Sequence, residues 1–298
     1  MFLPRILGGA IVAALLIAPA ARADVLDAHD GVYVSASGGT ALWNRYEQGH
    51  YGLISSDGKP VGIRTSKRPF DVSLGTDAGG RRLAVYSRDN HTLYALDLKS
   101  GHERSLHLEG QTPALSHGVL AFGRGSTVYV GRLGRLPRAI AHIAGSKSEI
   151  TGVANSSRGV AFSVYDDPNN GTAMYFKRAG RGALRKLTSG GFGEENAKTH
   201  VSPVLRGGKL YWAFSNQGET KGPNGWVIRY DLDTRTLRAA EATGFLDAVA
   251  VDGSRLITSS FSRSSDWNEG QGGSDQVATL DAAVWTAPPT AAGFHDHK

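Results

Sequence analysis

The sequence predicts an all-β chain, a single β-propeller of six four-stranded blades that follows an N-terminal signal peptide, with seven blades as the alternative. Three observations predict this fold class. After Ala23, no segment longer than about two turns places apolar residues on one helical face. Short alternating runs rich in Val, Leu, Tyr and Phe are separated by Gly, Asp, Asn and Ser, as in antiparallel strands. The runs recur in one fixed order of four, with first strands near residues 31, 71, 112, 150, 201 and 246. A four-stranded unit with a period of about 40–45 residues is typical of propeller blades.

The first 23 residues have the three-part design of a secretory signal peptide. Arg5 supplies the positive charge, residues 6–18 are apolar apart from two glycines, and Ala21 and Ala23 are the small residues of a cleavage site before Asp24. The alternative, a membrane anchor, needs an apolar stretch of roughly 20 residues, and this segment is shorter. We therefore expect cleavage before Asp24, no membrane insertion afterwards, and a secreted or periplasmic, cell-envelope protein.

The second copy of the repeat shows its four strands most clearly. These strands cover residues 71–75, 82–88, 92–98 and 103–108, and Gly, Asp, Asn and Ser fill the turns between them. The other copies place their strands, in the same order, at 31–36, 41–46, 51–56 and 60–65; 112–116, 119–123, 127–133 and 137–143; 150–154, 159–165, 173–178 and 183–187; 201–205, 209–215, 226–232 and 236–240; and 246–251, 255–261, 276–281 and 284–287.

Packing in a ring lets each blade bury both of its faces and leaves only short sheet edges. A β-sandwich does not predict four strands in one repeated order, and a solenoid would need polar capping repeats, which neither end of the chain provides. We predict that the propeller covers residues 24–290 and that residues 291–298 form a disordered tail.

Composition limits the class of protein and its partners. The sequence contains no cysteine, so an exported fold must be stabilised by a packed core and not by disulfides. The formal net charge is +6, but the basic residues are scattered singly along the chain. A nucleic-acid-binding groove would concentrate them on one face among aromatic residues. We therefore expect no nucleic-acid partner.

Two of the repeats are similar to a known family. Arg82-Leu-Ala-Val-Tyr followed by Leu93-Tyr-Ala-Leu-Asp-Leu resembles the repeats of TolB-like (WD40-like) extracytoplasmic propellers, in which an apolar second strand precedes a third strand ending in an aliphatic–Asp–Leu step. Lys209-Leu-Tyr-Trp-Ala-Phe with Arg229-Tyr-Asp-Leu-Asp looks the same. The resemblance covers about two of the six blades, and it implies a propeller fold outside the cytoplasm.

The sequence offers no clear catalytic signature. It contains neither a G-x-S-x-G elbow nor an H-E-x-x-H motif, and no thiol is available. Residues 166–171, Asp-Asp-Pro-Asn-Asn-Gly, place oxygen ligands at alternate positions as calcium loops do, but the same residues make a plain turn, which is the favoured interpretation. Carboxylates and an imidazole lie where first strands enter the predicted channel, and could hold a cation such as Ca²⁺: Asp71, Glu149, His200 and Asp247. No other cofactor is expected.

Insertions fall on one face of the predicted ring. The connections at 166–172, 188–200, 216–225 and 262–275 are the long ones, and they all belong to blades 4–6. In a propeller, connections between the second and third strands share a face with those between blades. Long loops on a rigid scaffold are the usual place for binding residues. The residues predicted to bind from this rim are Trp267, Trp226, Asp266, Glu269 and Asn216.

Two functions from different classes follow from these observations. The first is a non-catalytic, monomeric binding module that contacts a protein or a glycan through the loops of blades 4–6. The second is a metal-dependent hydrolase of the lactonase type, with its site at the mouth of the channel.

Overall fold

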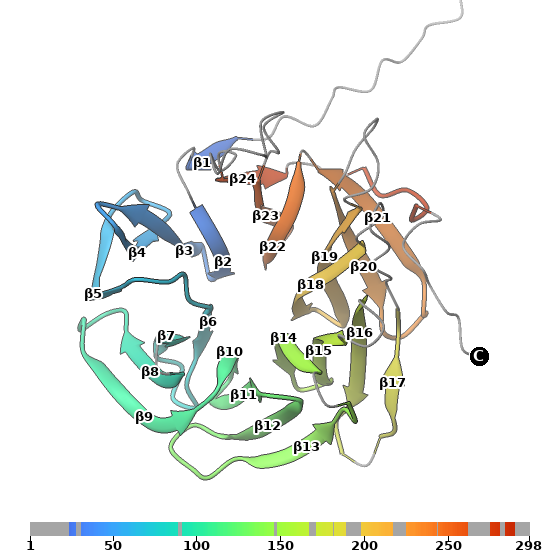
Figure 1. Ribbon diagram of the computed structural model, residues 1–298, viewed down its shortest axis with the longest axis horizontal. Helices are drawn as coiled ribbons and strands as arrows, with labels where there is room; N and C mark the ends of the chain where they lie inside the picture. The colour runs from blue at the N-terminus through green and yellow to red at the C-terminus, as the bar shows by residue number, and fades with distance from the viewer. Residues whose placement is uncertain are drawn as a thin grey trace, which may run out of the picture.

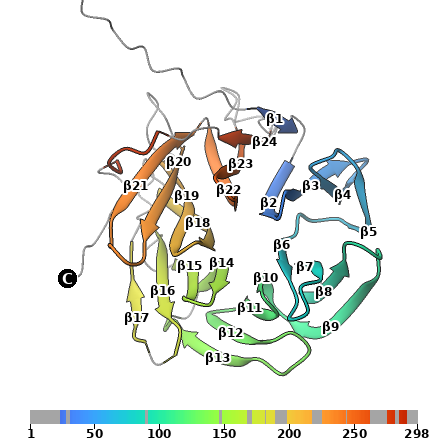
Figure 2. The ribbon, with the colours of Figure 1, turned by 180° about the vertical axis from the view of Figure 1, so that it is seen from behind.

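The described residues form a ring of β-sheets (Figure 1), and residues from all six sheets line a central channel. The computed structural model describes residues 24–27, 31–88, 91–145, 148–166, 171–180, 182–188, 198–216, 225–242, 244–261, 275–280 and 284–289. Within them, six antiparallel sheets of four strands each surround the channel, which confirms the six-bladed β-propeller (Figure 2). The predicted signal peptide and the predicted tail lie outside these residues. No helix able to span a membrane occurs in the part of the chain that is described.

In blades 1 to 5 the strands follow the chain from the channel outward. Blade 1 contains β2 (Gly31–Ser37), β3 (Thr40–Glu47), β4 (His50–Ser55) and β5 (Pro60–Ser66); blade 2 contains β6 (Val72–Thr76), β7 (Arg82–Ser87), β8 (Thr92–Asp97) and β9 (Glu103–Glu109); and blade 3 contains β10 (Gln111–Ser116), β11 (Val119–Arg124), β12 (Thr127–Arg132) and β13 (Arg138–His142). Blade 4 contains β14 (Glu149–Ser156), β15 (Gly159–Asp166), β16 (Gly171–Arg178) and β17 (Leu184–Lys186), and blade 5 contains β18 (Lys198–Arg206), β19 (Lys209–Asn216), β20 (Gly225–Asp231) and β21 (Leu237–Ala242). These bounds match the predicted strands to within three residues.

Blade 6 is completed by the N-terminal end of the propeller, which corrects the sequence prediction. Its strands are β22 (Phe245–Asp252), β23 (Arg255–Phe261), β24 (Asp275–Leu280) and, as the outer strand, β1 (Val25–Asp27). The predicted fourth strand at 284–287 instead bridges to blade 5, where Thr286 pairs with Ala239. The two ends of the ring therefore meet in one sheet, as the positions of β1 and β24 in Figure 1 show.

The core lies between the blades. Six hydrophobic clusters in the described residues each combine side chains from two neighbouring blades. The fourth residue of the second strand recurs in these clusters, and in blades 1 to 5 it is at most 2% exposed: Trp43, Val85, Phe122, Phe162 and Trp212. This recurrence explains the apolar second strands of the sequence repeat, since this position is buried in each of these five blades.

Adjacent inner strands come so close that one of them requires glycine. A Cβ atom on Gly75, in β6, would lie 2.1 Å from the carbonyl oxygen of Leu115 in β10. Side-chain oxygens also link these strands, because Ser35 accepts the N–H of Leu74 at 2.9 Å and Ser73 accepts that of Leu115 at 3.0 Å. The channel wall is therefore continuous from blade 1 to blade 3.

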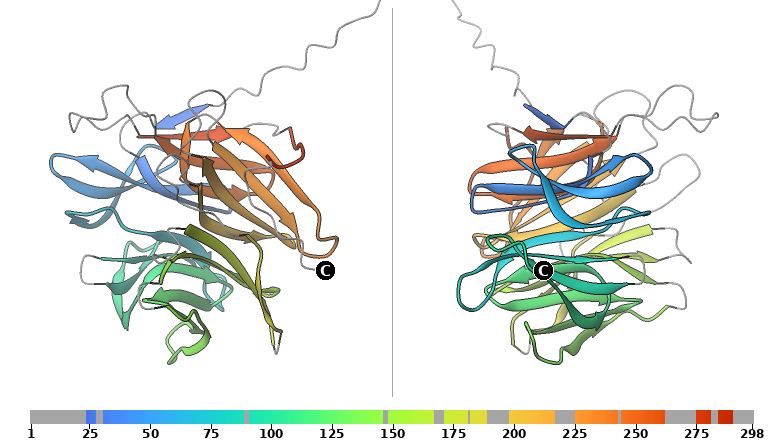
Figure 3. Two further views of the ribbon diagram at one scale, coloured as in Figure 1. Left: turned by 45° about the vertical axis from the view of Figure 1, so that its right-hand side comes forward. Right: turned by 90° about the vertical axis from the view of Figure 1, so that its left-hand side faces the viewer.

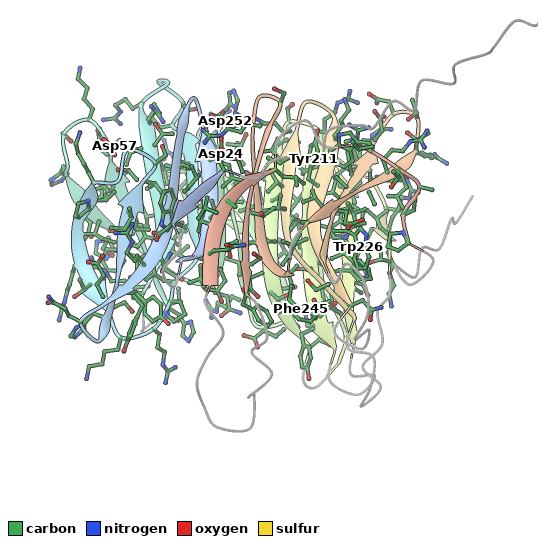
Figure 4. The ribbon with its side chains drawn as sticks, turned by 90° about the horizontal axis from the view of Figure 1, so that it is seen from above. Asp24, Asp57, Tyr211, Trp226, Phe245 and Asp252 are labelled. Atoms are coloured by element: carbon green, nitrogen blue, oxygen red, sulfur yellow. The ribbon has the colours of Figure 1, made fainter. Side chains whose placement is uncertain are left out.

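The two faces of the ring differ in the connections that they carry. Strands cross from one face to the other (Figure 3), and Figure 4 shows Asp252 and Asp57 at one face and Phe245 at the opposite one. We call the first the turn face, because it carries the turns between first and second and between third and fourth strands. The other is the mouth face, where the remaining connections begin and end.

Candidate functional site

The inner strands are irregular close to the mouth face. In five of them, within the described residues, the pairing with the second strand shifts, and these shifts lie around Tyr33, Thr112, Thr151, Ser202 and Asp247. Bulges re-aim side chains and are common beside functional sites. At Tyr33, Thr112 and Ser202 the backbone is left-handed, with φ of 55°, 49° and 52°. Such values are unusual for a β-branched or bulky residue, so three alternate blades share one uncommon conformation.

These irregularities produce a ring of channel residues, one from each blade. In each blade, one residue of the first strand pairs with the fifth residue of the second strand. The member of the ring comes directly before or after that paired residue, so all six lie within about one residue of the same depth in the channel. They line a channel of about 520 Å³. The members of this channel ring are Tyr33, Asp71, Thr112, Thr151, Ser202 and Asp247.

Negative charge gathers on one side of the channel ring. The Oδ2 atom of Asp71 accepts the N–H of Thr112 at 3.1 Å, and Asp71 has no ion pair with any described residue. Burial raises the pKa of Asp71 to about 6. Burial, followed by the charges of Asp71 and Asp247, also raises the pKa of Tyr33. The charges of Asp71 and Asp247 therefore both act on Tyr33.

The opposite end of the channel has a different charge. Arg206 is the basic side chain among the described residues that line the channel, and it lies at the turn face, 3.6 Å from Asp252. Asp252 also accepts the backbone N–H groups of Gly38 and Gly39, at 2.9 and 2.6 Å. The turn-face end is therefore bridged by contacts between blades 5, 6 and 1, whereas the channel ring presents acceptors.

The structure brings together two of the four predicted cation ligands. Asp71 and Asp247 both belong to the channel ring. Glu149 is exposed outside the channel lining and accepts a hydrogen bond from the side chain of Gln111 at 2.7 Å.

The placement of His200 at the channel mouth was wrong. His200 is 0% exposed, and its Nδ1 atom lies 3.0 Å from the indole nitrogen of Trp212 in the core of blade 5. Successive side chains of a strand point to opposite faces of the sheet. An error of one residue in the predicted register therefore places a side chain on the wrong face.

The described residues do not add a further acidic or imidazole ligand beside Asp71 and Asp247. They contain no group of three or more His, Cys, Asp or Glu side chains that could hold a metal ion, and no histidine among them lines the channel. The metal-dependent hydrolase therefore stays a prediction. In the candidate calcium loop, residues 167–170 lie outside the described residues.

Two members of the predicted binding rim are core residues. Trp226 is 9% exposed, and its ring lies 5.5 Å from that of Phe214. Asn216 is 2% exposed. Trp226 belongs to the hydrophobic cluster between blades 4 and 5. The burial of both side chains corrects the prediction that they are surface contacts. Trp267, Asp266 and Glu269 lie outside the described residues, so their role stays a prediction.

Sequence reasoning missed most of the channel ring, although part of it has a signal. Thr112 and Ser202 each precede a proline, in Thr-Pro and Ser-Pro pairs inside predicted first strands. Proline inside a strand marks an edge or a bulge, and the free edge of these strands lines the channel. Tyr33 has no such neighbour, so only the structure reveals it.

Fold and site together define a six-bladed propeller with a polar channel mouth. No protein-family model and no curated protein matches this chain. Among solved structures it is similar to the luciferin-regenerating enzyme, with a TM-score of 0.57 and 13% identity over 92% of this chain and 99% of that one. It is also similar to a chain of the nidogen/laminin complex, with a TM-score of 0.52 and 12% identity over 80% of this chain and 86% of that one.

A third solved structure concerns the family suggested by the repeats. TolB from Acinetobacter baumannii matches with a TM-score of 0.49 and 16% identity, over 79% of this chain and 61% of TolB. Likenesses at these identities show the fold alone. Membership of the TolB-like family therefore stays a prediction.

Proposed function

We propose that this protein is a non-catalytic binding module that holds a protein or a glycan on its mouth face. The observation that carries the proposal is the channel ring, which gathers two carboxylates, three hydroxyl side chains and a tyrosine at one end of the channel. The channel volume of about 520 Å³ is within the range of ligand pockets.

Carboxylates on the turn face have a different task from those of the channel ring. Asp77, Asp97 and Asp231 each accept two backbone N–H groups within their own turns, at 2.9 to 3.1 Å. These N–H donors lower the pKa of all three. Asp71 instead accepts one N–H and has a raised pKa. Its remaining hydrogen-bonding capacity favours a donor from outside the chain.

The channel ring suits a partner that presents hydrogen-bond donors. Carboxylates and hydroxyls accept from amines, backbone amides and sugar hydroxyls, and Tyr33, which is 37% exposed, adds an aromatic surface. The connection that contains Trp267 leaves β23 at Phe261, and Phe261 pairs with Phe245 on the mouth face. A rim anchored by Trp267 would therefore belong to the same face as the channel ring.

The absence of cysteine allows a direct test of the binding face. Lys67 follows β5 on the mouth face, Lys99 lies in a turn on the opposite face, and both are exposed. A single Lys67→Cys or Lys99→Cys substitution permits attachment to a biosensor in a defined orientation. The attached protein is then exposed to a panel of glycans and to fractions of cell-envelope proteins. We expect one of these to bind when the protein is attached through position 99. Attachment through position 67 should abolish that binding, because the surface then blocks the mouth face.

The matched pair of substitutions makes the outcome clear, since both remove one exposed lysine. Equal binding in the two orientations would contradict a mouth-face site. Binding only through position 67 would place the site on the turn face. The Asp71→Asn variant, attached through position 99, should then bind the captured partner with lower affinity, which would show that the channel ring contributes to binding.

A further inference from the structure

Blade 3 gives the turn face an uncompensated positive charge. Residues 110–148 contain no aspartate or glutamate. Arg132, Arg135 and Arg138 lie in or beside the turn between β12 and β13, and all three are exposed. None of them has an ion pair with a described residue. In contrast, the exposed Arg158 of blade 4 is neutralised by Asp233 of blade 5 through contacts of 2.6 and 2.7 Å.

An apolar side chain stands in the middle of this charge. Leu136 is 92% exposed, whereas Leu133 of the same turn packs against the cluster between blades 2 and 3. The N–H of Arg135 donates to the carbonyl of Arg132 at 2.9 Å, which closes the turn. Leu136 directly follows this hydrogen-bonded turn, and its side chain lies in solvent. We call residues 132–138 the basic hairpin.

We propose that the basic hairpin docks on the surface of a bilayer that contains anionic lipids. Arginines near such a surface are attracted to the headgroups, and an apolar side chain between them can enter the boundary with the acyl chains. A soluble polyanion would use the arginines but would leave Leu136 in water. The contact is peripheral and needs no membrane-spanning segment. It also leaves the mouth face free, because the basic hairpin is on the turn face.

Vesicle flotation tests this contact with the complete exported protein. The probes are vesicles of phosphatidylcholine alone and of phosphatidylcholine with phosphatidylglycerol. We expect binding to the anionic vesicles only, weakened by added salt because the charges are exposed. The triple variant R132Q/R135Q/R138Q should bind on the order of a hundredfold more weakly, since each arginine contributes about fivefold. Leu136→Ser should weaken binding about tenfold through the loss of apolar burial.

A matched control separates local charge from net charge. The variant R64Q/K67Q/R68Q also removes three exposed cations, but from blade 1 near the mouth face, and it should bind like the wild type. If both triple variants lose the same amount of binding to the anionic vesicles, the net charge alone explains the binding and the proposal is overturned. Wild-type binding to heparin or single-stranded DNA without binding to vesicles, or an unchanged affinity in Leu136→Ser, would also overturn it. Thermal melting checks that each variant is folded, which we expect because all of the substituted side chains are exposed.

Discussion

Asp27 closes the ring of blades, and Asp27→Ala measures how much this closure stabilises the fold. The Asp27 side chain is 2% exposed and belongs to β1, the outer strand of blade 6. Its Oδ2 atom accepts the indole N–H of Trp43 at 2.6 Å and the Nε–H of Arg45 at 2.7 Å. Both partners belong to β3, so one carboxylate links blade 6 to blade 1.

The magnitude follows from the burial of the two partners. Removing the carboxylate leaves the N–H of Trp43, a residue 1% exposed, without this acceptor, which costs about 1–3 kcal/mol. The ion pair with Arg45 adds about 1 kcal/mol, because 23% of the Arg45 side chain is exposed and solvent screens the pair. A loss of about 2–4 kcal/mol corresponds to a melting temperature lower by roughly 4–16 °C in a domain of this size.

Differential scanning calorimetry of Asp27→Ala and Asp24→Ala tests this value. Asp24→Ala removes a carboxylate next to the same strand, but the contacts of Asp24 with Thr279 use backbone atoms, its N–H at 3.2 Å and its carbonyl at 2.9 Å. We expect the control to melt like the wild type. If Asp27→Ala melts within about 2 °C of the control, the carboxylate does not hold the ring closed and the reasoning is refuted.

Three further predictions concern the wall and the core. Gly75→Ala should lower the free energy of unfolding by about 1–3 kcal/mol, measured by urea denaturation, because the new Cβ would meet Leu115; an unchanged midpoint would contradict that contact. Since burial raises the pKa of Asp71 from 3.8 to about 6, the folded state holds this proton more tightly than the unfolded state. The contribution of Asp71 to the free energy of unfolding then falls as pH rises from about 4 to 6. Asp71→Asn should therefore raise the melting temperature near pH 7 but not near pH 4, and equal changes in melting temperature at the two pH values would contradict this. Trp226→Ala should destabilise the chain by about 3–5 kcal/mol in the same urea assay, whereas a small loss would mean that Trp226 is not core.

The strands could be predicted from the sequence because each blade repeats one local pattern. The second strands of blades 1 to 5 place a buried apolar residue at the same position, as Trp43 and Phe162 do, and the turns between strands use Gly, Asp and Asn. Ring closure could not be predicted in this way. Val25–Asp27 is three residues long and pairs with β24, which follows it by about 250 residues, so no local pattern marks it. Val284 and Trp285 looked like a strand because they are apolar, and Trp285 does pack, against Tyr211 of blade 5.

The channel ring depends on register, which a single sequence determines poorly. Asp71 and Asp247 line the channel, and their position near the start of inner strands allowed this placement to be expected, whereas their role as cation ligands stays a prediction. His200 occupies a similar position in the sequence, but the irregular pairing between Val201 and Val204 separates it from the ring. Its side chain therefore enters the core beside Trp212. A bulge shifts every side chain before it, so alternation alone gives the wrong face for such residues.

The residues that the turns require explain part of the negative charge on the turn face. They do not explain the basic hairpin, and this supports its docking on a membrane. In blades 2 and 5 the turns are built by Asp77, Asp97 and Asp231, whose ionised carboxylates accept backbone N–H groups. The turn of the basic hairpin uses Gly134 instead, at φ 81°, so it needs no aspartate and brings no negative charge. A glycine turn does not, however, require three arginines within seven residues, nor a leucine that is 92% exposed at its tip. None of the three arginines forms an ion pair with another described residue, and the leucine is not buried. An anionic bilayer gives both features a role, because it neutralises the arginines and takes the leucine out of water in one contact.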